Sequence, residues 1–288
     1  MEILVRVPGS CGELVQGWAE GEPFLGTCPI DKYTTVEVSS DFSGQYGLGK
    51  KSQMALSLTL SRLGKTEFPY GIRLTSELSQ GKGMASSSAD IAAVVVAVME
   101  AFCQTWSAQL IMEIATSIEP TDGVFCQGIA LMNHITGYVM TCYKNVPALN
   151  VAIFDIGGMV DTCEFHAQRK TKKEMYSSEA MSRMLADFRA AMDAQDEVAV
   201  SRVATQSAFF NQDNLYKKEL AALWELGKEA GALGVNVAHS GTVIGLWWPC
   251  QADKKEIIQW AEQSARYLSL KFMGVAQLQA GGVEVRRT

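Results

Sequence analysis

The chain has 288 residues, of which 48% are hydrophobic and 19% are charged, and its formal net charge is −6 at pH 7. A negative net charge disfavours nucleic-acid partners, because such partners need a surface with clustered Lys and Arg side chains. No apolar run approaches the roughly 20 residues of a membrane span, and the N-terminus lacks the basic and apolar regions of a signal peptide. We therefore expect a globular cytoplasmic protein, long enough for one α/β unit or two closely packed domains.

Seven cysteines are scattered along the chain without Cys-x-x-Cys spacing. An odd and scattered set argues against a disulfide framework and against a zinc site. We expect these side chains to be reduced thiols, mostly buried as small apolar groups.

Strand and helix patterns alternate through the first half of the chain. Runs rich in β-branched and aromatic residues predict strands, and apolar residues at helical spacing predict helices. The predicted strands are 3–7, 33–38, 70–75, 137–142 and 151–155, and the predicted helices are 51–63, 85–102 and 110–118.

The second half opens with three helical patterns in succession and then returns to strands. The predicted helices are 175–192, 197–210, 216–229 and 253–267, and the predicted strands are 235–238, 243–247, 269–275 and 283–286. No repeat or low-complexity linker separates two domains. We place a division near residue 155, so that residues 1–155 and 156–288 pack over a shared cleft. Trp247-Trp248-Pro249 is either core or interface, so a homodimer remains open.

The segment 79–90, with the sequence SQGKGMASSSAD, leads directly into the apolar run 91–99. Its glycines allow a tight turn with N–H groups pointing inward, and the following helix start offers unpaired amides and the positive end of its dipole. This pattern is typical of a phosphate site, although a capped helix after a flexible loop is a common alternative. The candidate phosphate-binding residues are Gly81, Lys82, Gly83, Met84, Ala85, Ser86, Ser87 and Ser88.

Two further segments complete a pattern. Residues 8–17 (PGSCGELVQG) follow the first strand, and residues 237–243 (VAHSGTV) place a tight turn between two strands. In this order the three segments resemble motifs of the GHMP small-molecule kinases, a superfamily named for galactokinase, homoserine kinase, mevalonate kinase and phosphomevalonate kinase. Ala85 stands where the usual phosphate loop has a glycine. With that variant, the first two segments resemble the L-threonine kinase branch known from cobalamin side-chain synthesis.

The resemblance covers nearly the whole chain and implies an α+β fold. It implies an N-terminal α/β half of the ribosomal protein S5 domain 2-like type and a ferredoxin-like C-terminal half over a shared cleft. The implied activity is ATP-dependent phosphorylation of a side-chain hydroxyl, with Mg²⁺ and ATP bound and a hydroxyl amino acid, first of all L-threonine, as acceptor.

Two carboxylates stand at a predicted helix end, where Pro120 must break the helix. The resemblance implies that Glu119 and Ser87 bind Mg²⁺, with Ser86 and Ser88 as close competitors for the serine, and that Asp122 lies beside the acceptor hydroxyl. The alternative for Asp122 is an N-cap of a helix through 124–132. Lys82 is our candidate for neutralising a β- or γ-phosphate, although an exposed lysine is usually only solvated.

An amino-acid acceptor needs a carboxylate for its ammonium group. Any of Glu13, Asp155 and Asp161 could supply that carboxylate. Further expected substrate contacts are Ser10, Cys11, Gly12 and His239, and further expected supports of the nucleotide site are Ser240 and Gly241.

Two other functions compete. A kinase for homoserine, serine or another small alcohol would keep the same motifs, since one methyl group in a pocket is worth only about 1–3 kcal/mol. A non-catalytic nucleotide-binding protein would keep the fold and lose the chemistry. A dinucleotide enzyme is disfavoured, because no Gly-x-Gly-x-x-Gly follows the first strand.

Overall fold

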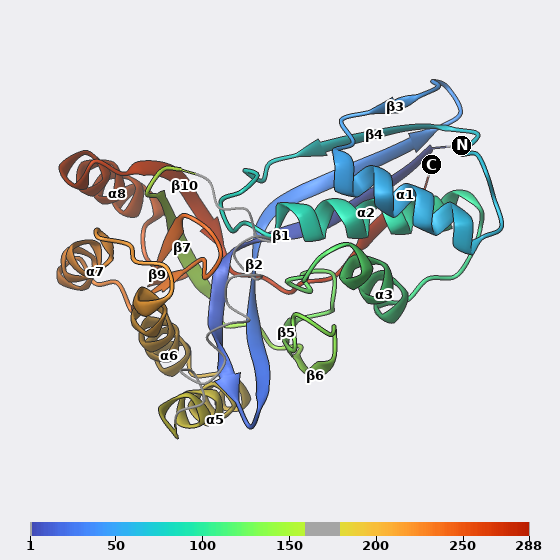
Figure 1. The fold of residues 1–288 in the computed structure, drawn as a ribbon. Coiled ribbons are helices and arrows are strands. Elements are labelled where there is room, and N and C mark those ends of the chain that lie inside the picture. The colour runs from blue at the N-terminus through green and yellow to red at the C-terminus, as the bar shows by residue number, and fades with distance from the viewer. Residues whose placement is uncertain (1, 159–178, 288) are drawn as a thin grey trace.

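Two long antiparallel strands, β1 (Glu2–Ala19) and β2 (Glu22–Ser39), connect the two parts of the molecule (Figure 1). The structure is a computed structural model that describes residues 2–158 and 179–287. Glu20 and Gly21 join the strands, and both have positive φ angles (54° and 82°), as tight hairpin turns require. Within the described residues, eleven strands form one sheet around this hairpin.

The N-terminal part of the sheet is covered on one face by three helices (Figure 1). Helix α2 (Ser86–Ala101) is buried on nearly all sides because it packs against β1 and β2 and also against α1 and α3, which explains its almost wholly apolar sequence. The other elements of this part are α1 (Lys50–Arg62), α3 (Ala108–Ile118), β3 (Gln45–Tyr46), β4 (Gly71–Ser76), β5 (Ile129–Met132), β6 (Val139–Tyr143) and β11 (Glu284–Arg287).

The C-terminal part has the strand order β10-β7-β9-β8, with every neighbouring pair antiparallel. In chain order this is strand, helices, two strands, helix and strand, which is the ferredoxin-like arrangement. Its elements are β7 (Leu149–Asp155), α5 (Glu179–Ala194), α6 (Glu197–Phe210), the 3₁₀ helix η2 (Asn211–Asp213), α7 (Leu220–Glu229), β8 (Gly234–Val237), β9 (Val243–Pro249), α8 (Lys254–Leu268) and β10 (Lys271–Gln277). The predicted α+β class is confirmed.

Most predicted elements are present, with three differences. The first strand does not end at Val7 but continues to Ala19 through residues 8–17, called the first motif below. The register of its pairing with β2 shifts on both sides of Gly12. The helix considered for 124–132 is wrong: Gly123 and Gly128 have positive φ angles of 64° and 92°, and the only regular element there is β5. The predicted start of the helix 175–192 lies outside the described residues, and α5 accounts for its remainder.

Side-chain burial and strand pairing bear on the remaining expectations about the fold. Trp247 and Trp248 are buried, so they belong to the core and not to an interface. β7 pairs with β9 and β10, whereas the predicted division at residue 155 grouped it with the N-terminal half, and the position of that division stays a prediction. Three of the six cysteines in the described part are buried, fewer than expected. Among the described helices none is long and apolar enough to cross a bilayer.

Candidate active site

The glycine loop, residues 79–85, is attached to the first motif by main-chain hydrogen bonds. The Ser10 amide donates to the Met84 carbonyl at 2.9 Å, and the Gly12 amide donates to the Gly83 carbonyl at 3.0 Å. Gly12 has a φ angle of 60°, and a Cβ there would lie 2.5 Å from the Val237 main chain. The first motif therefore holds the loop with its backbone and requires glycine at its closest approach.

The third motif, residues 237–243, binds the same loop from the other side. The amides of Thr242 and Val243 both donate to the Lys82 carbonyl, at 2.9 and 3.0 Å. A Cβ on Gly83 would lie 2.2 Å from the Ala238 Cβ, and one on Gly241 would lie 2.4 Å from the Lys82 carbonyl oxygen. Three segments that are far apart in the sequence thus meet at the start of α2.

Ala85 is the N-cap residue of α2 and has φ 53° and ψ 25°, the left-handed conformation. No side chain caps this helix end. The first amides of α2 therefore keep their capacity to bind an anion, and the positive end of the helix dipole adds to it. This backbone suits the glycine that the resemblance implies at this position, since a Cβ disfavours the left-handed region.

The substitution Ala85→Gly is expected to stabilise the protein. Relief of the left-handed alanine gains about 1–2 kcal/mol, and the greater freedom of the unfolded glycine chain cancels about 0.4–1 kcal/mol of that gain. Equilibrium denaturation with urea measures the difference. Ala93→Gly, inside the same helix, is the matched control and is expected to destabilise by about 1 kcal/mol or more. Equal losses in both variants would contradict the prediction.

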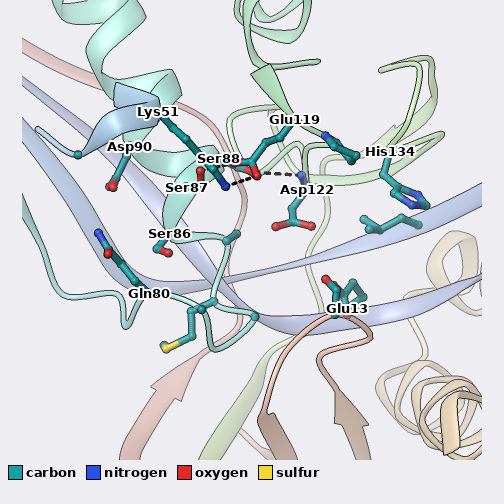
Figure 2. A pocket seen from close by; sticks show the side chains of 18 of the residues that line it. Glu13, Lys51, Gln80, Ser86, Ser87, Ser88, Asp90, Glu119, Asp122 and His134 are labelled. Atoms are coloured by element: carbon teal, nitrogen blue, oxygen red, sulfur yellow. Dashed lines mark hydrogen bonds and ion pairs between the residues drawn. The ribbon is translucent and has the colours of Figure 1, made fainter. Parts of the chain in front are cut away.

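A cavity of about 600 Å³ lies at the N-terminal end of α2 (Figure 2). It is lined by eleven of the residues expected from the sequence: Glu13, Gly81, Gly83, Met84, Ala85, Ser86, Ser87, Ser88, Glu119, Asp122 and Ser240. The structure therefore brings the phosphate loop, the two carboxylates of the 117–123 segment and the first motif into one space.

Lys82 does not line this cavity. Its Nζ pairs with Asp155 Oδ2 at 2.7 Å and donates to the Gly158 carbonyl at 2.6 Å. Asp155 also accepts from Thr242 Oγ1 at 2.6 Å and from the Gly157 amide at 3.0 Å. Burial acts to raise the pKa of Asp155, but these hydrogen bonds outweigh it and hold that pKa below its ordinary value. The pair fastens the loop to the end of β7, and neither side chain lines the cavity.

The other expected residues that the structure describes do not line the cavity. Ser10 Oγ donates to the Gly12 carbonyl at 2.9 Å, and Cys11 is buried, which raises the pKa of its thiol far above the ordinary value. None of Ser10, Cys11, Gly12, His239 and Gly241 lines the cavity. Asp161 lies outside the described residues.

Glu119, at the C-terminal end of α3, is nearly fully buried and has a partner on each carboxylate oxygen. Ser87 Oγ donates to Oε1, and Lys51 Nζ forms an ion pair with Oε2. Within the described residues no group of three or more His, Cys, Asp and Glu side chains could hold a metal ion. One hydroxyl and one carboxylate nevertheless fit Mg²⁺, which usually takes one or two carboxylates together with substrate phosphates.

Asp122 follows Pro120 in an irregular segment, and its amide donates to Ser88 Oγ at 3.2 Å. Burial raises the pKa of Asp122 from 3.8 to about 8, and the nearby negative charges of Glu13 and Glu119 add to the shift. Figure 2 shows the Asp122 and Glu13 side chains pointing toward one another across the cavity. The site thus contains a proton-binding carboxylate that faces a second carboxylate.

Glu13 is held in place by His239 of the third motif. Its Oε2 accepts from the His239 amide at 2.8 Å and lies 3.0 Å from His239 Nδ1. The neighbouring Ala238 carbonyl accepts from the fully buried Lys217 Nζ at 2.9 Å. Burial lowers the pKa of Lys217 to about 8, and the Glu13 charge opposes that shift. These contacts fix the Glu13 carboxylate at the edge of the cavity.

Several cavity residues are not among the site residues predicted from the sequence. The sequence predicts Lys51 only as part of a helix. Lys50 and Lys51 stand in the first turn of that helix without an acidic residue, where they oppose the helix dipole, and this unfavourable placement is a signal for a functional role. Gln16 Nε2 and His134 Nε2 lie 3.4 Å apart at the Glu13 end of the cavity, and no local pattern indicated them.

Comparison with known proteins agrees with this geometry. Residues 50–132 match the GHMP kinases N terminal domain. The chain is 27% identical over 290 residues to L-threonine kinase of Citrobacter freundii, covering 98% of this chain and 99% of that protein, and 29% identical to L-threonine kinase of Salmonella typhimurium, covering 84% and 82%. Homoserine kinase from Cytophaga hutchinsonii has the same fold, with a TM-score of 0.72 at 15% identity over 99% of this chain and 97% of that one. The chain thus contains a segment that matches the GHMP kinases N terminal domain, and it has the fold of the GHMP kinases.

Proposed function

We propose that this protein is an ATP-dependent kinase that phosphorylates the side-chain hydroxyl of a small amino acid, with L-threonine as acceptor and O-phospho-L-threonine as product. The observation that carries the proposal is the single cavity in which the uncapped start of α2, the Ser87–Glu119 pair and Asp122 face Glu13. Similarity to two L-threonine kinases over most of the chain supports the choice of acceptor. Such a product would serve the aminopropanol linker of cobalamin.

In the proposed reaction the acceptor oxygen forms a bond to the γ-phosphorus of ATP, and the bond between that phosphorus and the β,γ-bridging oxygen breaks. ADP carries away the bridging oxygen, and the hydroxyl proton passes to Asp122. The amides at the start of α2 hold the phosphates in line, because phosphoryl transfer depends mainly on positioning and on charge neutralisation. Magnesium, held by Ser87 and Glu119, would neutralise the β- and γ-phosphate oxygens.

The Glu13 end of the cavity suits the rest of an amino acid. We assign the Glu13 carboxylate to the ammonium group of the acceptor, since its position is fixed by His239 and its side chain points into the cavity (Figure 2). Gln16 and His134, beside it, offer donors for the acceptor carboxylate. The hydroxyl would then lie between these groups and the phosphate loop, where Asp122 stands.

Release of ADP from ATP and Mg²⁺ tests the proposal, with L-threonine, L-serine, L-homoserine, O-methyl-L-threonine or no acceptor added. L-threonine is expected to give the highest kcat/KM, by roughly 10- to 200-fold over serine, which lacks the methyl group. O-methyl-L-threonine, which has no hydroxyl, is the matched control and should release no ADP above the background. Mass spectrometry identifies the phosphorylated product.

Other outcomes would select the competing functions. A higher kcat/KM with serine or homoserine would keep the kinase and change its acceptor. Tight ATP binding without ADP release in the presence of any hydroxyl amino acid would overturn the kinase proposal in favour of a non-catalytic nucleotide-binding protein.

A further inference from the structure

We infer that Lys51, at the start of α1, is the side chain that neutralises the nucleotide's terminal phosphates, a role that the phosphate-loop lysine Lys82 does not fill. The inference rests on the proposed kinase function and adds a residue to its nucleotide site. It follows from the contacts of the two lysines, the charge around the start of α1 and the contacts of Glu119.

The two lysines have different partners. Lys51 lines the cavity, and its Nζ contacts Glu119 on the wall that also carries Ser87 (Figure 2). Lys82 lies in the loop itself, but its charge is already paired with the buried Asp155, and its Nζ also donates to the Gly158 carbonyl. Only Lys51, of these two, can meet phosphates without breaking a bond that fastens the loop.

The start of α1 is an unfavourable place for cations. Lys50 and Lys51 occupy its first turn, which contains no acidic residue, and the N-cap Gly49 offers no side chain. The positive end of the helix dipole repels cations there, typically by 0.3–1 kcal/mol. The starts of α1 and α2 line the same cavity, so its wall there combines two positive helix-dipole ends with Lys50 and Lys51, next to Glu119. Such a wall suits a polyanion, which adds the negative charge that this turn lacks.

The Lys51 contact with Glu119 keeps the ammonium group beside the expected phosphate position. Glu119 is nearly fully buried, whereas the Lys51 side chain is 40% exposed and can therefore shift. Phosphates bound to the amides of Ser86–Ser88 would lie next to Ser87, the other partner of Glu119. A short movement of a flexible four-carbon stem is enough to transfer the ammonium group from the carboxylate to a phosphate oxygen.

Calorimetric titration of the protein with magnesium-free ADP and with AMP tests this role. Lys51→Met is expected to weaken ADP binding roughly 10- to 100-fold, the effect of losing one hydrogen bond to a charged group. AMP affinity should remain unchanged, because AMP lacks the terminal phosphates. Lys51→Arg should retain most of the ADP affinity, since it keeps the charge. Lys65→Met, at an exposed position just beyond the C-terminal end of α1, is the matched control and should match the unaltered protein.

The double variant Lys51→Met/Glu119→Gln guards against misfolding, because it leaves no unpaired carboxylate beside Asp122, and it should show the same selective loss of ADP affinity. Equal weakening of ADP and AMP would reduce Lys51 to a structural residue and overturn the inference. Unchanged ADP affinity in Lys51→Met, with selective loss in Lys82→Met, would return the role to Lys82. If the unaltered protein releases no ADP with any hydroxyl amino acid, the kinase proposal fails, while these affinities still decide the role of Lys51.

Discussion

Replacing Asp122 by asparagine is expected to lower kcat by about 10²- to 10⁴-fold, the usual contribution of a group that accepts a proton in the transition state. Asparagine has nearly the same shape and keeps the amide that donates to Ser88 Oγ. ATP affinity, measured by calorimetry, should therefore stay the same. Steady-state release of ADP in the presence of L-threonine measures the loss.

The pH dependence of the unaltered enzyme provides a second readout. Burial raises the pKa of Asp122 to about 8, with added repulsion from Glu13 and Glu119, so the free enzyme carries this carboxyl mostly protonated at pH 7. Because a base must be deprotonated to act, kcat/KM should rise with pH and level off above about pH 8. Asp122→Asn should lack this rise. A variant that keeps both the rate and the pH profile of the unaltered enzyme would remove Asp122 from catalysis.

The same substitution is expected to make the protein more stable at neutral pH. Below about pH 4 the carboxyl is protonated in both the folded and the unfolded chain. Between about pH 4 and pH 8 only the unfolded chain releases the proton, so the free energy of unfolding falls as pH rises through this window. Each unit of pKa shift corresponds to roughly 1.4 kcal/mol. Urea denaturation at pH 5 and pH 8 should show a gain for Asp122→Asn that is larger at pH 8.

Replacing Glu13 by glutamine is expected to raise the KM for L-threonine roughly 10- to 100-fold, as loss of an ionic hydrogen bond to the ammonium group predicts. The amide side chain retains an acceptor for the His239 amide, so the third motif stays attached. Coupled ADP-release assays over a range of threonine concentrations give KM and kcat separately. The KM for ATP is expected to remain the same, since Glu13 lies at the opposite end of the cavity from Lys51 (Figure 2).

An acceptor without an ammonium group separates recognition from general damage to the site. For 3-hydroxybutyrate, the unaltered enzyme and Glu13→Gln should have similar kcat/KM values, whereas for L-threonine the two should differ. Glu113→Gln, an exposed charge loss on α3, is the matched control. A parallel loss with both acceptors would show that Glu13 supports the fold of the first motif and does not recognise the amino acid.

Much of the fold was predictable because local patterns were strong. The run 85–102 could only be a central helix, and α2 accounts for nearly all of it. The first motif was harder: Pro8 and Gly9 interrupt the period-two alternation, so the continuation of β1 through it is set by pairing with β2. The run 124–132 fits helix and strand equally well by its apolar content, but Gly123 before it and Gly128 within it favour turns, so only Ile129–Met132 forms a regular element.

The site was predictable as a set of motifs and less so as a set of contacts. The order of three glycine-containing segments indicated where phosphate would bind, and the structure brings them together. Which lysine lines the cavity depends on carboxylates that are distant in sequence. Lys51 forms an ion pair with Glu119, 68 residues later, and Lys82 forms one with Asp155 at the end of β7. Pairings over such separations leave no trace in local spacing, so the sequence favoured the lysine inside the motif.

The fastening of the glycine loop by main-chain atoms has an evolutionary consequence. Amides at positions 10, 12, 242 and 243 make the bonds, so those bonds survive exchange of the side chains of the non-glycine residues there. In the proposed arrangement, side chains at the acceptor end, such as Gln16 and His134, can then change to suit a different alcohol while the proposed nucleotide end stays the same. One scaffold can in this way supply enzymes for many metabolites by changing a handful of positions, which agrees with the variety of acceptors among proteins of this fold.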